Sequence, residues 1–122
     1  MENIGTITKN VKKMLSLTSD VSKIFIDNEN FKRHLIKRNH QNMISHIPKI
    51  SQYLKNPDYV GVNPREKGVS LEYIVQVDPN ILIAVKLDSK NDYFYVVTMH
   101  EISRLKLTQR IRNGRLRKVD KR

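Results

Sequence analysis

Three of the four histidines lie close together, in the stretch FKRHLIKRNHQNMISHI over residues 31–47, which is rich in lysine, arginine and amide side chains. Histidine ordinarily gains and loses a proton near neutral pH, and cationic side chains bind phosphate. Together these residue types suit acid–base chemistry at a phosphodiester. A solvated helix that carries histidines with no catalytic role is the alternative interpretation.

His34 and His40 are six residues apart, so a continuous helix would turn one about 600° from the other and put them on different faces. They can converge on one site only if the helix ends before His40, and Asn39 is a candidate terminator. We treat both as candidate catalytic groups. In the competing interpretation each is a surface group that the nearby cations keep neutral. His46 and His100 are expected to be structural or surface groups.

Lys86 and Thr98 are polar residues within otherwise apolar, strand-like segments. Lys86 interrupts ILIAVKLD, and strand alternation puts it on one face with Leu82 and Ala84. There it either stabilises a crowded phosphate or faces solvent. Thr98 is expected to share a face with Val96, where it either donates to a phosphate oxygen or packs as strand threonines commonly do.

Glu72 and the arginines near the C-terminus are further charged candidates. Glu72 is a possible general base or a partner for Lys86, but an exposed strand glutamate is the commoner case. Arg110, Arg112 and Arg115 belong to a dense basic segment that starts at residue 104. Arginine binds phosphate bidentately, so this segment favours RNA binding over a merely solvated helix face.

Composition narrows the classes of function. The 122 residues suit one domain, and the net charge of +11 makes a polyanion the expected partner, with RNA or DNA ahead of an anionic membrane. The absence of cysteine excludes disulfides, thiolate metal ligands and a cysteine nucleophile. No Gly-rich phosphate loop or metal-binding motif is present, so neither metal nor organic cofactor is expected. Without a spanning segment or secretion signal, we expect a cytosolic protein.

The periodicity of apolar residues predicts helices first and strands afterwards. Helical spacing occurs around residues 11–17, with a possible short strand at 24–26, and helices are expected from residue 28 or 30 to 39 and over 45–56. Four strands are predicted at 59–62, 70–77, 81–88 and 93–99, and the short turns between the later ones require antiparallel neighbours. A basic helix over 100–114 and a mobile tail over 115–122 complete the chain. The fold class is therefore α+β: N-terminal helices packed on a roughly four-stranded antiparallel sheet, followed by a C-terminal basic helix.

Four ordered segments carry a family resemblance: HLIKRNH, NPDYVGVNP, LEYIVQVDPNILIAVKLDSKNDYFYVVTM and RIRNGRLRKV. Together they resemble the phage-associated barnase, EndoU, colicin E5/D and RelE-like nuclease domains. The resemblance implies a nuclease-like domain over residues 22–119, preceded by a possibly helical extension over 1–21 and followed by a mobile tail over 120–122. It also implies a metal-independent ribonuclease that uses the RNA 2′-hydroxyl as its nucleophile.

The resemblance further suggests which residues act. Those expected to be catalytic are His40, His34, Lys86, Thr98 and Arg110. Those expected to hold RNA are Arg112, Arg115, Arg117, Lys118 and Tyr95. Apart from the resemblance, Tyr93 or Tyr95 at a sheet edge is a candidate for stacking on a base, and packing is the commoner role of the tyrosines.

Two functions of different classes follow. The first is an endoribonuclease toxin or effector of phage or mobile-element origin that cleaves tRNA or other host RNA in the host cytoplasm. The alternative is a non-catalytic basic module on the same scaffold that binds nucleic acid or an acidic protein. Convergence of His40, Lys86, Thr98 and an arginine in one cleft would favour the enzyme. A cognate inhibitor or protein target is a possible partner, and the sequence does not determine the oligomeric state.

Overall fold

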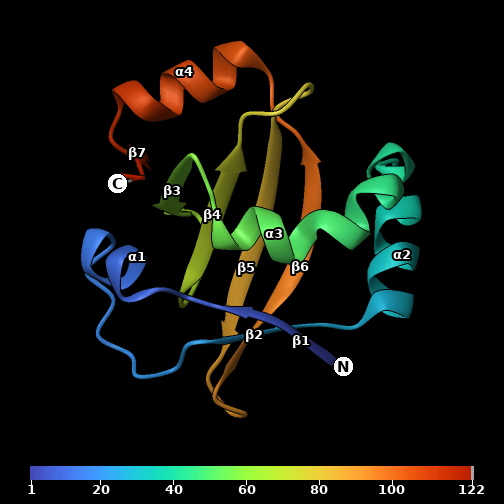
Figure 1. Ribbon diagram of the computed structural model, residues 1–122, viewed down its shortest axis with the longest axis horizontal. Helices are drawn as coiled ribbons and strands as arrows, with labels where there is room; N and C mark the ends of the chain where they lie inside the picture. Colours follow the sequence, from blue (N-terminus) through green and yellow to red (C-terminus); the bar gives the residue numbers. More distant parts are fainter. Residues whose placement is uncertain (122) are drawn as a thin grey trace.

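The computed structural model describes residues 1–121 and contains one mixed sheet with helices on both faces (Figure 1). The strands are β1 (Glu2–Thr6), β2 (Lys23–Ile26), β3 (Tyr59–Val62), β4 (Ser70–Val75), β5 (Ile81–Asp88), β6 (Tyr93–Glu101) and β7 (Leu116–Lys118). The helices are α1 (Lys9–Met14), α2 (Asn28–Lys37), the 3-10 helix η1 (Gln41–Lys49), α3 (Ile50–Lys55) and α4 (Arg104–Arg112). The strand order is β1-β2-β6-β5-β4-β3-β7, and only the β2–β6 pair is parallel. The predicted α+β class is confirmed.

The predicted meander forms the centre of the sheet. Strands β3 to β6 pair antiparallel in sequence order, as the short turns require. The turn between β5 and β6 is closed by Asp88, whose carboxylate accepts hydrogen bonds from the backbone N–H groups of Lys90 and Asn91. One face of this sheet carries the main core, and α1, α2 and α3 cover it.

The sheet has seven strands because three short segments pair with distant parts of the chain. β1 pairs with β2 at one edge, and β7 pairs with β3 at the other. The expected mobility of the tail from residue 115 is wrong for β7, since Leu116 and Val119 are buried and Lys121 forms an ion pair with Asp58. Part of the predicted tail, residue 122, lies outside the described residues. A strand of three residues is too short to show a period of its own.

Residues 1–21 form part of the same core as the rest of the chain. They supply β1 and α1, and Ile7 and Val11 are buried in the main hydrophobic cluster. Thr8 caps α1 by accepting a hydrogen bond from the N–H of Val11. The domain limits predicted at residues 22 and 119 stay a prediction.

The helix predicted over residues 45–56 is divided between a 3-10 helix and a short α-helix. Residues 41–49 adopt 3-10 geometry, with Pro48 inside, and the α-helix begins only at Ile50. It ends at Lys55, where the Asn56-Pro57 pair stops it as expected.

The end of α2 determines the direction in which His40 leaves the helix. Asp27, rather than Asn28 or Asn30, caps its start. At its end Asn39 adopts a left-handed conformation with φ of 60°. The N–H of His40 donates to the carbonyl of Leu35 and that of Asn39 to the carbonyl of Ile36, the two hydrogen bonds of a Schellman motif. The helix therefore ends before His40, as the spacing of the two histidines required.

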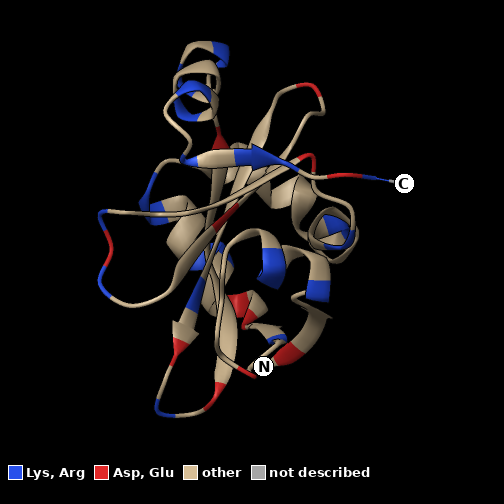
Figure 2. Ribbon diagram, turned by 90° about the vertical axis from the view of Figure 1, so that its left-hand side faces the viewer, with Lys and Arg blue, Asp and Glu red and all other residues tan. Residues whose placement is uncertain are grey.

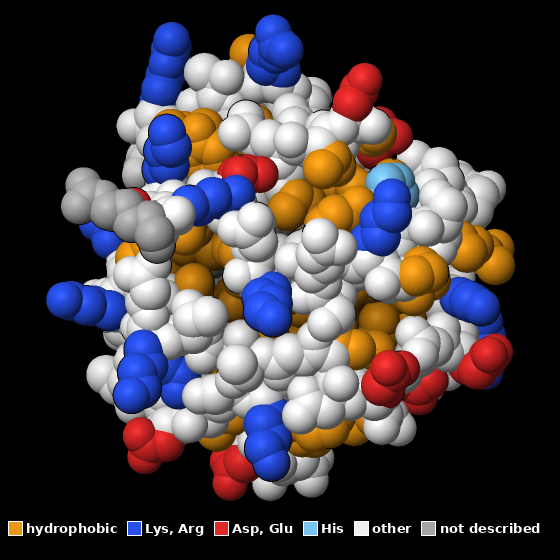
Figure 3. Space-filling view, in the orientation of Figure 1, with side chains coloured by type: hydrophobic (Ala, Val, Ile, Leu, Met, Phe, Trp, Pro, Cys, Tyr) orange, Lys and Arg blue, Asp and Glu red, His pale blue; other side chains and the backbone are white. Residues whose placement is uncertain are grey.

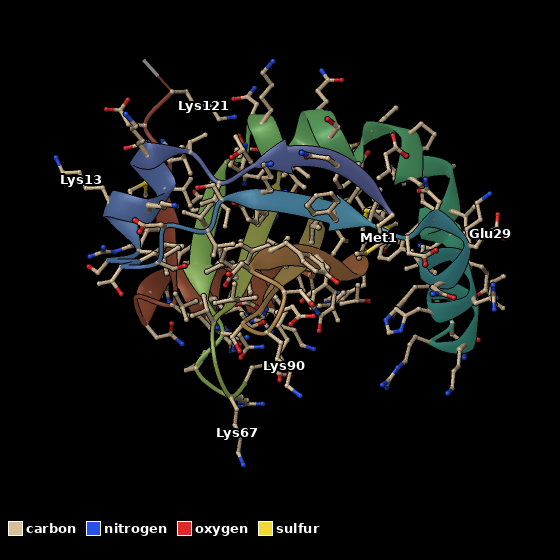
Figure 4. The ribbon with its side chains drawn as sticks, turned by 90° about the horizontal axis from the view of Figure 1, so that it is seen from below. Met1, Lys13, Glu29, Lys67, Lys90 and Lys121 are labelled. Carbon is tan, nitrogen blue, oxygen red and sulfur yellow. The ribbon has the colours of Figure 1, made fainter. Side chains whose placement is uncertain are left out.

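The second face of the sheet is only partly covered. α4 packs on it through Leu107, against a small cluster that includes Ile74, Leu82 and Leu116. Beyond α4 this face is open, and we call it the open face. Lys67 and Lys90, at the tips of two loops, extend on this side, away from α3 (Figure 4).

Basic residues are unevenly distributed. α4 and β7 carry several Lys and Arg positions near the edge of the open face (Figure 2). On the helix-covered face, Lys and Arg side chains are scattered without one continuous patch (Figure 3). No helix within residues 1–121 has the length and apolar character needed to cross a bilayer.

A β-bulge in β6 changes one prediction. Ala84 pairs with Thr98, whereas the next residue, Val85, pairs with Val96, so Val97 is an extra residue. Thr98 consequently lies on the face opposite to Val96, and the expectation that they share a face is wrong. The bulge turns Thr98 onto the open face.

We predict that Gly61→Ala destabilises the protein. A Cβ at Gly61 would lie 2.0 Å from the carbonyl oxygen of Arg115, so the segment leading into β7 would have to move. The free energy of unfolding measured in urea should fall by about 1–3 kcal/mol. Gly5→Ala is the matched control, because its Cβ meets no atom within 4 Å. Equal stability of the two variants would contradict the prediction.

Candidate active site

His40 and His100 form a pair at one end of the open face. The Schellman turn points His40 away from α2, and His100 lies near the end of β6. Their ring centroids are 5.4 Å apart and the rings are tilted by 32°. Asn42 holds the two segments together by donating to the Glu101 carboxylate at 2.8 Å. Two imidazole rings therefore lie side by side.

Hydrogen bonding fixes the neutral tautomer of His100. Its Nδ1 lies 2.8 Å from the backbone carbonyl oxygen of Glu101. A carbonyl oxygen can only accept, so Nδ1 carries the proton and donates it. In the neutral ring, Nε2 is then unprotonated and able to accept a proton, as a general base must.

The surroundings of His40 favour its neutral form in the free protein. Burial, followed by the proximity of His100 and Arg38, lowers the pKa of His40 below its usual value of 6.5. A bound phosphate would act in the opposite direction, because an adjacent negative charge favours the protonated ring.

A buried carboxylate organises the arginines beside this pair. Glu72 is 3% exposed and accepts hydrogen bonds from Arg115 at 2.7 and 2.8 Å and from Arg110 at 3.2 Å. The expectation of an exposed strand glutamate is therefore wrong, and the partner of Lys86 is Glu66, at 3.7 Å, rather than Glu72. Burial lowers the pKa of Arg110, and Glu72 opposes that shift. The guanidinium of Arg110 thus stays charged, and Glu72 holds it in place.

The histidine pair and Arg110 line one open pocket of about 590 Å³, which we call the histidine cleft. Ser103 and Lys106, at the start of α4, belong to the same lining. The cleft contains two imidazoles, two cationic side chains and the carboxylate of Glu101, which accepts the hydrogen bond from Asn42. This combination can bind a phosphate and move protons to and from its oxygens.

Thr98 and Lys86 lie on the same sheet face at increasing distance from the cleft. Thr98 lies on β6 two residues before His100. Across the sheet it pairs with Ala84, which in turn pairs with Glu72. Lys86 is two residues further along β5 than Ala84 and pairs across the sheet with Tyr95. His40 and Arg110 therefore line one cleft, whereas Thr98 and Lys86 lie outside it, so the expected convergence of all four residues is not met.

The other predicted residues are dispersed. His34 lines a separate pocket between α2 and β6, and Tyr95 lies at the same pocket. Arg115 binds Glu72, and Arg117 donates to the carbonyl of Met14 on the other side of the sheet. Arg112 is exposed on α4, whereas Lys118 lines a hollow beside Asp58.

The sequence prediction did not select His100 and Lys106. A period-two reading from Thr98 would have placed His100 on its face, and so the signal for His100 was present. Lys106 had no signal that distinguished it from the other cations of α4, because its place depends on how that helix packs.

The open sheet face, the histidine pair and the buried Glu72 with its arginines belong to one basic α+β protein. A family model, phage-Barnase-EndoU-ColicinE5/D-RelE like nuclease3, matches residues 2–109, and the chain belongs to this nuclease family. The family implies a nucleic acid substrate. No curated protein and no solved structure matches significantly. Residues 1–121 hold no group of three His, Asp or Glu side chains arranged to bind a metal ion.

We predict that Glu72→Gln destabilises the fold by about 3 kcal/mol, because removing the charge leaves two partly buried guanidinium groups without their counter-ion. Chemical denaturation measures this change. Glu66→Gln is the control, since Glu66 is 51% exposed and its ion pair with Lys86 should contribute less than about 1 kcal/mol. Similar losses in the two variants would show that the buried cluster has no special role.

We also predict that His40 titrates below 6.5 and that His100→Gln moves its pKa upward, because the variant removes a neighbouring ring that can carry positive charge. NMR titration of the ring protons measures both. As the pH falls below 6.5, the unfolded chain binds protons that folded His40 and His34 resist, so the free energy of unfolding must fall. The fall should be smaller in His40→Gln. An unchanged pH dependence in that variant would refute the assignment.

Proposed function

We propose that this protein is a metal-independent endoribonuclease that cleaves RNA through attack by the 2′-hydroxyl. The observation that carries the proposal is the pairing of His40 with His100, beside Arg110 and Lys106, in one open pocket. Membership of a nuclease family supplies the nucleic acid substrate. The histidine pair supports RNA over DNA, because only RNA has the 2′-hydroxyl that a neutral imidazole can activate.

The two histidines take complementary roles in the proposed step. His100, with Nδ1 bonded to the Glu101 carbonyl, accepts the 2′-hydroxyl proton at Nε2. The 2′-oxygen then bonds to phosphorus while the bond from phosphorus to the 5′-oxygen breaks. His40, protonated once a phosphate lies beside it, gives its proton to the departing 5′-oxygen. The products are a 2′,3′-cyclic phosphate and a free 5′-hydroxyl.

The cations act on the charge that accumulates on phosphate. Arg110 and Lys106 line the same pocket as the histidine pair, and Glu72 holds Arg110 in position before substrate arrives. Arg115 also binds the carboxylate of Glu72 and so helps to hold Arg110 in place. We therefore assign Arg115 a positioning role. Thr98 and Lys86 lie further along the open face and would contact the RNA backbone on one side of the cleft.

The basic residues away from the cleft fit a wider RNA surface. Arg112 and Lys118 are exposed on α4 and β7, where they can bind backbone phosphates. We propose host RNA, with tRNA as the first candidate, as the target of a phage-borne effector acting in the host cytoplasm. The non-catalytic module is the competing proposal, and the cleavage experiment decides between them.

We predict that the protein cleaves tRNA and mixed-sequence RNA in EDTA and leaves 2′,3′-cyclic phosphate ends. His100→Gln and His40→Gln should each slow single-turnover cleavage about 100- to 10,000-fold, because each removes a proton-transfer group. Arg110→Lys should slow it about 100- to 1,000-fold. His46→Gln is the matched control, since His46 bonds Tyr53 at 3.1 Å and does not line the cleft.

The pattern of loss identifies the mechanism. A 2′-deoxynucleotide at the cleavage position should block the reaction completely, because it removes the nucleophile. Cleavage of that substrate, or full activity in both histidine variants, would rule out the proposed step. Salt-sensitive binding without cleavage by the wild-type chain would make it a binding module.

A further inference from the structure

A second pocket, of about 370 Å³, lies further along β6 from the histidine cleft, and we call it the tyrosine pocket. Its lining includes Tyr93, Tyr95 and Val97 of β6, His34 and Asn30 of α2, and the carboxylates of Asp27 and Asp88. Met1 lies beside the first turn of α2 and also belongs to the lining (Figure 4). The proposed chemistry uses none of these residues.

Aromatic rings form one wall of this region in a fixed arrangement. Tyr93 packs edge-on against Phe25, with ring centroids 5.4 Å apart, and against Tyr95 at 6.4 Å. Phe25 and Tyr95 are register partners in the parallel β2–β6 pair. Because the backbone pairing and the mutual ring contacts hold these side chains, little conformational entropy remains to be lost when a flat ligand stacks on them.

The two pockets differ in charge. The histidine cleft contains Lys106 and Arg110 together with the carboxylate of Glu101, whereas the tyrosine pocket contains two carboxylates and no Lys or Arg among its lining residues. Burial, with further contributions from Arg38, His40 and Lys37, lowers the pKa of His34, so that its ring is neutral near pH 7. The cleft thus favours a phosphate, and the tyrosine pocket disfavours a phosphate but suits an uncharged aromatic group.

A polar atom beside the tyrosine pocket lacks a partner. His34 Nε2 is buried and makes no hydrogen bond with any described residue. A buried polar group without a partner is costly, and such groups in native structures commonly mark a ligand or water position. Asn30 adds an amide to the same lining, although its nitrogen already donates to Asp27 at 2.9 Å.

The two pockets lie along one strand. Tyr95 and His100 are five residues apart on β6, which corresponds to roughly 16 Å of extended backbone. Stacked nucleotides rise about 3.4 Å each along a strand. An RNA chain following β6 would therefore span both pockets with a few nucleotides, and its path would pass Thr98.

We propose that Tyr93, Tyr95 and His34 form a nucleobase-binding subsite, which takes an unpaired base a few nucleotides from the phosphate held in the histidine cleft. The proposal rests on the proposed function for its RNA substrate. Under it, His34 contacts a base instead of moving protons. The preferred substrate is therefore single-stranded RNA, since a base in a duplex is unavailable for stacking in the pocket.

The test is equilibrium binding of a short RNA with 2′-O-methyl groups throughout, which cannot be cleaved by 2′-hydroxyl attack. Tyr95→Ala should weaken binding about 5- to 150-fold. Tyr95→Phe should bind like the wild type, because it keeps the ring. Tyr53→Ala is the control, since that tyrosine lies on α3, outside both pockets. Thermal melts verify that each variant is folded.

A scan with single abasic nucleotides locates the base. One abasic position should weaken wild-type binding and have no further effect in Tyr95→Ala, because the two changes remove the same contact. The salt dependence of binding should be unchanged in Tyr95→Ala, whereas Lys106→Gln should reduce its slope by about one.

The outcomes separate this inference from the proposed function. Cleavage that depends on the histidines, without any position that couples to Tyr95, would overturn the subsite alone. Coupling at one position in a protein that cleaves no RNA would support the subsite and overturn the ribonuclease. A wild-type chain that binds no single-stranded RNA would overturn both.

Discussion

The bonding of two arginines to one buried carboxylate is the constraint around which the open face is organised. Glu72 lies on β4, Arg110 on α4 and Arg115 in the connection to β7, so one side chain joins three segments. Gly61, which pairs with Glu72 across β3 and β4, has no side chain, and the backbone of Arg115 occupies that space. The ion pairs thus hold α4 over one part of the sheet and leave the rest open. The same contacts fix the cation that faces the histidine pair.

The two pockets along β6 differ in charge. At the His100 end lie two histidines, two cationic side chains and one carboxylate, and at the Tyr93 end lie aromatic rings, carboxylates and a neutral histidine. The two parts of a nucleotide differ in the same way as the two pockets. The phosphate is charged and strongly hydrated, whereas the base is flat and neutral. A single sheet face can therefore position both parts of a nucleotide chain through chemically distinct pockets. The sheet alone would not provide two distinct pockets. Helix α2 supplies part of the lining of the tyrosine pocket, and α4 supplies part of the lining of the histidine cleft.

Local sequence patterns gave the position of His40 once the helix end was recognised. Asn39 adopts the left-handed conformation that its short polar side chain tolerates, so α2 stops and His40 leaves the helix axis. Local sequence patterns did not identify His100 as the partner of His40. His100 lies 60 residues later, and only the pairing of β6 with the sheet and the bond from Asn42 to Glu101 bring the rings together.

The amino-acid sequence predicts the α+β class, the antiparallel meander, the end of α2 and the basic character of the chain, because each follows from short-range periodicity, turn chemistry or composition. Three features became apparent only in the tertiary structure. They are the burial of Glu72, the bulge at Val97 that puts Thr98 on the face opposite to Val96, and the added strands β1 and β7. These features depend on contacts between segments far apart in the chain. A three-residue strand or a single extra residue leaves no periodic signal, and an acidic side chain is buried only when distant arginines arrive to neutralise it.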